Sequence, residues 1–277
     1  MVLTARRALR KMRGGAQAHL VEADDSHFYV VKFLNNPQHR RILVNELTAA
    51  VLLRYLQIAT PETAIIHITQ DFLETNPDVH VQLGSRREPV RAGRHFASRF
   101  PGDPLTTAVY DFVPDAMLQS VVNHDHFRGV LVFDKWAANA DARQAIFFRA
   151  RLKDWASCGG FGRQRLGFVA LMMDHGYIFD GPHWDFSDSP IQGLYFRPAV
   201  YESVRSLDDF RPWLERVVHL PPDVLDEAAR LTPREWLDGD QDAFDALLER
   251  LWRRRTKVPD LLRDCAHSRV HPFPNWR

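Results

Sequence analysis

Apolar and polar positions alternate with a period of two in the first third of the chain, as they do in β-strands. Residues 17–34 contain two such runs, AHLVEA and HFYVVKFL, joined by the polar residues 24–26. Two alternating runs separated by a short polar turn predict a β-hairpin. A later run, ETAIIHIT, predicts another strand, and the polar residues 70–106 after it are expected to contain further short strands.

Between the hairpin and that later strand the spacing changes to that of a helix. Four apolar residues recur there at every fourth position: Leu43, Leu47, Val51 and Tyr55. This is the period of one helix face. We expect the helix to open near Asn36 and Pro37 and to stop at Pro61, which gives about five turns.

Helical spacing returns in the second part of the chain. Residues 127–134 follow it, two β-type runs (QAIFFRARL and RLGFVALMMD) then flank the glycine-rich segment 158–162, and several helical segments follow from Val200 onward. The glycine-rich segment is expected to be a hairpin loop. Strands that come first and helices that come last predict an α+β fold of two lobes: a small β-rich lobe over residues 1–112 and a larger, mainly helical lobe over residues 113–277.

Composition excludes several classes of function. The chain has 36 basic and 35 acidic residues, so no overall field draws it to nucleic acid or to anionic lipid. It has no apolar run of the roughly 20 residues that cross a bilayer and no apolar signal core at its start. Its two cysteines have no CxxC spacing, which argues against a zinc site and a disulfide framework. We therefore expect a cytoplasmic protein without direct nucleic-acid or membrane binding.

Three features in the β-rich part suggest phosphate chemistry. Gly14 and Gly15 precede the hairpin, and adjacent glycines let backbone amides approach phosphate oxygens closely. Lys32 shares a strand face with apolar residues, so it is expected to point inward and to need a counter-ion. Glu46 lies beside the apolar stripe of the predicted helix and also needs a partner. The alternatives are a tight turn for the glycines and solvent exposure for Lys32 and Glu46.

Polar residues also gather at two places in the second part. Asn139, Asp141 and Gln144 lie within six residues just before a strand, and Asp174 ends a very apolar strand. Two carboxylates brought together with an amide supply what phosphoryl transfer needs, namely oxygen ligands for Mg²⁺ and a base for the incoming hydroxyl. Turn capping is the alternative for each carboxylate.

These features occur in the order that protein-kinase-like phosphotransferases use. The chain resembles the HipA-like kinase family over residues 13–213. GGAQAHLV is similar to that family's phosphate loop, FDKWAANAD to its catalytic loop, and MMDHGYIF to the segment with its metal-binding acid. The resemblance implies a two-lobed kinase fold that uses ATP and Mg²⁺ and transfers the γ-phosphate to a serine or threonine hydroxyl of a protein.

The resemblance also implies roles for single residues. Asp141 would be the catalytic base, with Asn139 beside it, and Asp174 would ligate Mg²⁺. Lys32 would contact the phosphates and Glu46 would hold Lys32. The remaining positions are expected to bind the nucleotide: Gly14, Gly15, Ala16 and Gln17 at the phosphates, and residues 108–114 with Tyr110 and Phe112 as the hinge that receives the adenine.

The sequence departs from the family pattern at two positions. Family members commonly carry an asparagine as second metal ligand five residues after the catalytic aspartate, and Ile146 stands there. Gln144 is the nearest amide and is expected to serve as the second metal ligand. In the best-known members a serine ahead of the phosphate loop is autophosphorylated. Met12 occupies that register here, so we expect no switch of that type.

Two other functions remain open at this point. A small-molecule or lipid kinase would use the same acidic residues on a different acceptor. A nucleotide-binding pseudokinase that acts as a regulator is suggested by Ile146. An antitoxin partner is possible for this family, but no feature of the sequence supports one. His124, Asp125 and His126 could suggest a metal site, but they lie where a helix is expected to begin, and Asp125 is a plausible helix cap there.

Overall fold

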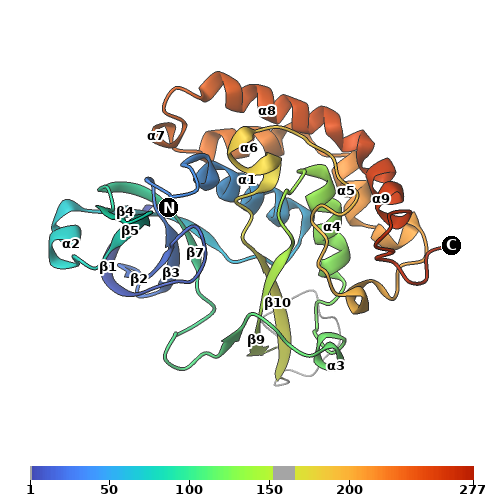
Figure 1. Ribbon diagram of the computed structural model, residues 1–277, viewed down its shortest axis with the longest axis horizontal. Helices are drawn as coiled ribbons and strands as arrows, with labels where there is room; N and C mark the ends of the chain where they lie inside the picture. Colours follow the sequence, from blue (N-terminus) through green and yellow to red (C-terminus); the bar gives the residue numbers. More distant parts are fainter. Residues whose placement is uncertain (1, 152–165) are drawn as a thin grey trace.

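The computed structural model describes residues 2–151 and 166–277. Its N-terminal strands close into a barrel in the order β1-β2-β3-β7-β4, at one end of the molecule (Figure 1). An apolar cluster that includes Val21, Val31 and Ile66 fills this barrel. The bounds of its strands are β1 Val2–Lys11, β2 His19–Ala23, β3 Phe28–Lys32, β4 Thr63–Ile68 and β7 Gly93–Arg99.

The predicted hairpin is confirmed, because β2 and β3 pair antiparallel on either side of the polar turn. The strand before it was not predicted. Four of the ten residues of β1 are arginine or lysine and exposed, in two adjacent pairs, so the strand lacks the apolar alternation that reveals a half-buried strand. Gly14 and Gly15 therefore lie in the turn between two paired strands, β1 and β2, rather than ahead of the first strand.

Helix α1 (Arg41–Leu56) is shorter than predicted at both ends. The segment before it forms a turn in which the Asn36 side chain accepts a hydrogen bond from the backbone N–H of Gln38. Gln57 ends the helix in a left-handed conformation, four residues ahead of Pro61. The helix is buried on nearly all sides. Glu46 thus lies inside the molecule and not merely beside an apolar stripe.

The polar region 70–106 contains a helix as well as the expected strands. Helix α2 (Gln70–Thr75) begins at Thr69, whose hydroxyl accepts a hydrogen bond from Phe72 N, and it lies at the outer end of the barrel (Figure 1). Strands β5 (His80–Leu83) and β6 (Arg86–Pro89) form a separate two-stranded sheet.

A second sheet of three strands lies below the helices in Figure 1. It consists of β8 (Val109–Tyr110), β9 (Gln144–Arg151) and β10 (Leu166–Met173). The two long strands match the β-type runs of the sequence, and their register pairs Met173 with Gln144. The glycine-rich segment 158–162 lies outside the described residues.

Helices make up most of the second part, as predicted. Helix α3 (Asp115–Leu118) and helix α4 (His126–Trp136) lie between β8 and β9 in the chain. Asp125 stands at the start of α4 without a side-chain capping bond, so the expected cap is wrong. The elements after the sheet are η2 Ile178–His183, η3 Pro198–Tyr201, η4 Leu207–Phe210, α5 Trp213–Val218, α6 Pro222–Leu231, α7 Arg234–Leu237, α8 Gln241–Arg254, η5 Arg255–Lys257 and α9 Val258–Ala266.

Strands first and helices last confirm the α+β fold class. The largest apolar cluster joins α1 to α4, α5 and the C-terminal helices, so α1 packs into the helical part although it follows the hairpin in sequence. The division between residues 112 and 113 stays a prediction. Among the described residues, no helix combines the length and the apolar character needed to cross a bilayer.

Asn45 of α1 holds the segment that follows β10. Its buried side-chain nitrogen lies 2.7, 3.1 and 3.0 Å from the backbone oxygens of Gly176, Ile178 and Gly181 and shares its two hydrogens among them. Its Oδ1 accepts a 2.8 Å bond from Trp184 Nε1. All hydrogen-bonding groups of one side chain are thus used to fix a loop that contains several left-handed residues.

Asn45→Ala is expected to lower the free energy of unfolding by about 2–4 kcal/mol, because it leaves buried carbonyls and an indole N–H without partners. Hydrogen exchange at residues 176–184 should speed up with it. The control is Asn275→Ala, which removes one exposed bond to Glu202 O. Urea unfolding of both variants checks this, and equal midpoints would rule out a clamp at Asn45.

His95 of β7 is fully buried, and its Nδ1 accepts a 2.9 Å hydrogen bond from Leu34 N. Burial lowers the pKa of His95 to about 3, because the charged imidazolium would lose its hydration. The folded chain therefore keeps His95 neutral over a pH range in which the unfolded chain takes up a proton.

The unfolded state binds the extra proton below pH 6.5, so the His95 contribution to stability is complete above that pH and is lost as the pH falls towards 3. Between pH 7.5 and pH 5, His95 alone should account for about 2 kcal/mol of the loss in unfolding free energy. Urea unfolding of wild type and His95→Asn at both pH values measures it. An equal pH dependence in the two proteins would mean that His95 is not buried neutral.

Candidate active site

Lys32 lies between two carboxylates that come from distant parts of the chain. Its Nζ pairs with Glu46 Oε1 from α1 and, at 2.7 Å, with Asp174 Oδ1 just after β10. Lys32 is 9% exposed and Glu46 is 4% exposed. The three residues that the sequence placed in one phosphate site are therefore in direct contact.

Electrostatics in this cluster favour the charged forms of Lys32 and Asp174, whereas burial raises the pKa of Glu46 against the attraction of Lys32. Burial opposes the charge of Lys32, but the carboxylates of Glu46 and Asp174 outweigh it and raise the pKa of Lys32. Lys32 in turn lowers the pKa of Asp174 below its ordinary value, against the effect of burial. Asp174 thus remains ionised at neutral pH, which is the state that a carboxylate needs to bind a hard cation.

The turn after β10 fits tightly against α1. Asp174 has a left-handed backbone with φ 60°, a conformation that is costly for a residue with a side chain and that clusters at functional sites. Glu46 Oε1 also accepts a 3.1 Å hydrogen bond from His175 N. A Cβ on Gly176 would stand 2.7 Å from Ile42 Cγ2. A glycine is required there for α1 to come this close.

A second buried ion pair holds the segment around Asn139. Asp134 and Arg143 pair in the interior with no exposed side-chain surface. Asn139 Nδ2 donates to Asp134 Oδ1 at 3.0 Å, and Asn139 Oδ1 accepts a 3.2 Å bond from Asp141 N. Both amide atoms of Asn139 are engaged inside the protein, so its side chain positions Asp141 and is not presented to a substrate.

His175 connects the two ion pairs. Arg143 Nη1 lies 3.0 Å from His175 Nδ1, and His175 Nε2 lies 3.2 Å from Met172 O. Because Arg143 can only donate, the neutral ring carries its hydrogen on Nε2. Burial and the charge of Arg143 hold the pKa of His175 well below its usual range. A continuous network therefore runs from Lys32 through Glu46 and His175 to the segment that carries Asp141.

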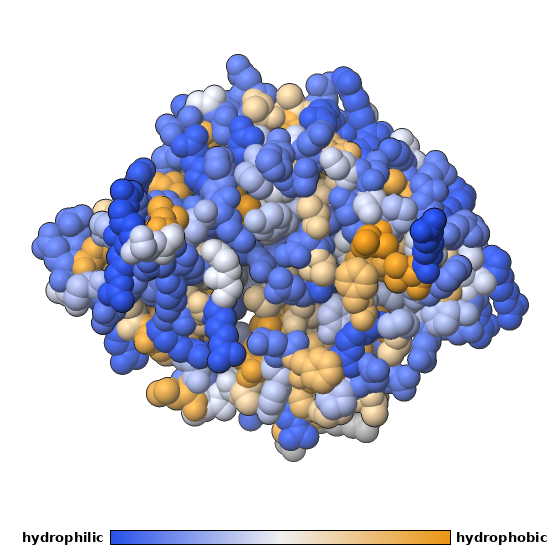
Figure 2. Space-filling view, viewed as in Figure 1, coloured by the Kyte–Doolittle hydropathy of each residue, from blue (hydrophilic) through white to orange (hydrophobic). Residues whose placement is uncertain are grey.

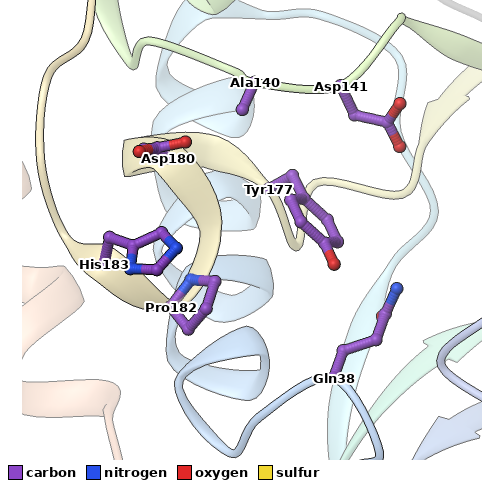
Figure 3. A pocket seen from close by; sticks show the side chains of 7 residues that line it. All are labelled: Gln38, Ala140, Asp141, Tyr177, Asp180, Pro182 and His183. Atoms are coloured by element: carbon purple, nitrogen blue, oxygen red, sulfur yellow. The ribbon is translucent and has the colours of Figure 1, made fainter.

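Asp141 is exposed and opens onto a pocket of about 430 Å³. Its Oδ1 accepts a 2.8 Å hydrogen bond from Ala142 N, which leaves Oδ2 facing solvent. Figure 3 shows Asp141 at the upper side of this pocket, Tyr177 in its middle and Gln38 across from it. Asp180, Pro182 and His183 line the other side. An accessible carboxylate beside a pocket suits a general base.

The glycine turn between β1 and β2 has the backbone freedom expected of a phosphate loop. Gly14 has φ 112°, and Gly15 is faced by the Gln38 side chain. Gln17 was expected to bind the phosphates, but its side chain is engaged elsewhere. Its amide pairs with both the N–H and the carbonyl of Gln82 at 2.7 Å, so this side chain anchors the loop to β5 and is not free for a phosphate. Ala16 is half-buried beside it.

The predicted hinge residues are exposed. Tyr110 in β8 is 46% exposed and Phe112 is 65% exposed, and the Arg197 guanidinium lies 4.5 Å from the Phe112 ring. Figure 2 shows a hollow at the centre of this face, with hydrophobic side chains gathered below it and to its right. No contact in the described residues joins Tyr110 or Phe112 to Lys32, so their part in adenine binding rests on the sequence.

Gln144 begins β9 opposite Met173, which puts it one position from Asp174 across the sheet. Its side chain is exposed. Ile146 lies two residues further in, opposite Leu171, and its apolar side chain is half-buried. Gln144 is therefore better placed than Ile146 to accompany Asp174. The described residues hold no group of three or more His, Cys, Asp or Glu side chains suited to a metal ion.

The sequence did not reveal Asn45, Gln38 or the Asp134–Arg143 pair as parts of the site. Asp134 falls on the apolar face of its predicted helix, and an acid at such a position signals a buried partner. Nothing in the local pattern marks Asn45 or Gln38, because their importance comes from loops that are distant in sequence.

Comparison with known proteins gives a family match for this chain. Residues 6–146, just over half of the chain, match the sequence profile of the family described as HipA-like kinase. The matched part contains the glycine turn, Lys32, Glu46 and Asp141, and Asp174 lies beyond it. A search of curated proteins gave no match.

A structural comparison finds solved structures of kinases similar to this chain. The Golgi casein kinase aligns with 96% of this chain and 72% of its own, at a TM-score of 0.50 and 13% identity. A structure of that kinase with Mn/ADP bound aligns with 97% of this chain and 73% of its own, at a TM-score of 0.48 and 12% identity. The Helicobacter pylori proinflammatory kinase CtkA aligns with 93% of this chain and 98% of its own, at a TM-score of 0.45 and 10% identity.

The likeness to the first of these structures concerns the fold alone, and it agrees with the arrangement of a barrel, a central buried helix and a helical part. The α+β fold is thus a protein-kinase-like one. The family match rests on the sequence and includes Lys32 and Glu46, whereas Asp174 lies beyond the matched residues. The chain belongs to the HipA-like kinase family.

Proposed function

We propose that this kinase binds ATP with Mg²⁺ and transfers the γ-phosphate to a serine or threonine hydroxyl of a protein. The observation that carries the proposal is the contact of Lys32 with both Glu46 and Asp174, in one network with the segment that bears Asp141. Kinases place a strand lysine, a helix glutamate and a metal-binding aspartate together in this way.

The binding part of the mechanism follows from the charges. The backbone of the glycine turn would cover the phosphates of the nucleotide, and Lys32 would contact them from below while Glu46 keeps it in place. Asp174, with Gln144 beside it, would hold Mg²⁺, which neutralises charge on the phosphate oxygens. One carboxylate together with phosphate oxygens is a usual ligand set for this ion.

The transfer part depends on Asp141. As the acceptor hydroxyl attacks, a bond forms between its oxygen and the γ-phosphorus, and the bond from that phosphorus to the bridging oxygen of ADP breaks. Asp141 accepts the hydroxyl proton. Asn139 and the Asp134–Arg143 pair fix the backbone that carries this base, so the main contribution of the protein is positioning.

Ile146 favours a second candidate, a nucleotide-binding protein that does not transfer phosphate. This residue occupies the position at which the family commonly has a metal-binding asparagine, and it packs on the sheet opposite Leu171. Such a protein would need Lys32 and Asp174 but not Asp141.

Isothermal titration with a non-hydrolysable ATP analogue tests the binding site. Wild type should bind the analogue in a Mg²⁺-dependent manner, and Asp174→Ala should lose that dependence because the ion loses its carboxylate. The control is Lys257→Ala, which removes an exposed lysine that pairs with Asp188 at the surface. If the wild-type protein binds no nucleotide with or without Mg²⁺, the proposal is wrong.

Asp141→Asn separates the two candidate functions. With radiolabelled ATP and a lysate as acceptor, a kinase should lose at least about 100-fold of its transfer rate when the base is removed, because general base catalysis contributes about that much. Nucleotide affinity should stay unchanged, since Asp141 lies on the acceptor side. Equal labelling by wild type and Asp141→Asn would show that Asp141 is not the base.

A further inference from the structure

Gln38 lies in the loop between β3 and α1. In the sequence it stands between Lys32 and Glu46, which form an ion pair. Its backbone is fixed, because Gln38 N donates a 2.9 Å hydrogen bond to Asn36 Oδ1. No role for Gln38 was predicted from the sequence. Its side chain is half-buried and points into the pocket in Figure 3.

The end of this side chain rests on the glycine turn. A Cβ on Gly15 would stand 2.8 Å from Gln38 Nε2, so the amide occupies the space that a side chain at position 15 would need. The same amide lines the pocket with Asp141 and Tyr177. Gln38 therefore connects the turn proposed to cover the phosphates with the pocket of the proposed base.

The pocket has a surplus of negative groups. Asp141 and Asp180 line it, and no lysine or arginine is among the described residues that line it. Lys32 and Arg143 are buried in ion pairs with acids. Arg41, whose Nη1 donates to the backbone oxygen of Pro182, is paired with Asp240. A phosphoryl group that passes through the pocket spreads negative charge over its oxygens, so it needs donors that are already in place.

The Gln38 amide is such a donor. Within residues 2–151 and 166–277, its side-chain nitrogen and oxygen have no hydrogen-bond partner, and only its backbone N–H is engaged. It carries no charge, so it can lie beside two carboxylates at little cost and still donate two N–H groups to an anion. Hydrogen bonds from such a donor to a charged oxygen are stronger than neutral ones.

We propose that Gln38 is a catalytic residue whose side-chain amide donates a hydrogen bond to the γ-phosphoryl group of bound ATP as the group moves towards the acceptor. This inference rests on the proposed kinase function and adds to it the residue that recognises the transferred group. Because Gln38 lies on the pocket side of Gly15, it contacts the γ-phosphate and not the part of the nucleotide that ADP retains.

Comparing two nucleotides isolates that contact. Gln38→Ala should weaken the Mg²⁺-dependent binding of a non-hydrolysable ATP analogue by about tenfold, the effect of one hydrogen bond to a charged group. Its affinity for ADP should stay within about twofold of wild type. Gln70→Ala is the matched control, because Gln70 is an exposed glutamine of α2 whose amide bonds only to Glu74. Gln70→Ala should change neither the affinity for the ATP analogue nor the affinity for ADP.

Two further variants sharpen the test. Gln38→Glu keeps the shape of the side chain but replaces donors by a negative charge, so the loss for the ATP analogue should exceed that of Gln38→Ala. In Gly15→Ala the new methyl group displaces the Gln38 amide, which is the flexible end of a side chain. Gly15→Ala should therefore also weaken binding of the ATP analogue but not of ADP. In the double variant this loss of affinity should be no larger than in Gln38→Ala alone.

The outcomes separate this inference from the function on which it rests. If the wild-type protein binds neither ADP nor the ATP analogue, both the kinase proposal and the role of Gln38 are overturned. If the wild type binds both nucleotides and Gln38→Ala and Gln38→Glu weaken them equally or not at all, the role of Gln38 alone is overturned. Circular dichroism of each variant confirms that folding is retained before binding is compared.

Discussion

The buried charge of Lys32 is the constraint on which the rest of this structure depends. A lone ammonium in the interior would be strongly destabilising, so the fold must bring Glu46 and Asp174 to it from α1 and from the end of β10. To meet that need, a barrel strand, the central helix and the second sheet have to converge at one point. That point is also where an ion and a nucleotide would need charged groups.

Burial of α1 explains why the arrangement is rigid. In this chain the helix that carries the glutamate packs into the largest apolar cluster, and it also holds the segment after β10 through Asn45. Moving Glu46 away from Lys32 would therefore disturb the core and release that segment. The network through His175 and Arg143 extends the same constraint to the residues around Asp141. Fold stability and site geometry are coupled in this protein.

The sequence predicted the parts of the site that follow local rules. Alternation indicated the strand with Lys32, period-four spacing indicated the helix with Glu46, and an acid at the end of an apolar strand indicated Asp174. The sequence could not show β1, whose arginine and lysine residues stand in two adjacent pairs, nor the engagement of Gln17 with β5, because that contact spans 65 positions. The roles of Asn45 and Gln38 also depend on close approaches between distant loops, which no local pattern records.

A double-mutant cycle on Lys32 and Glu46 tests most directly whether one buried cation joins these elements. Lys32→Met should lower the unfolding free energy by about 3–5 kcal/mol, because it leaves a buried carboxylate unpaired. Glu46→Gln should also be destabilising, but the double variant should be more stable than the sum of the two losses predicts by about 2 kcal/mol or more. Additive losses would contradict the account, because they would mean that Lys32 and Glu46 do not depend on each other in the folded protein.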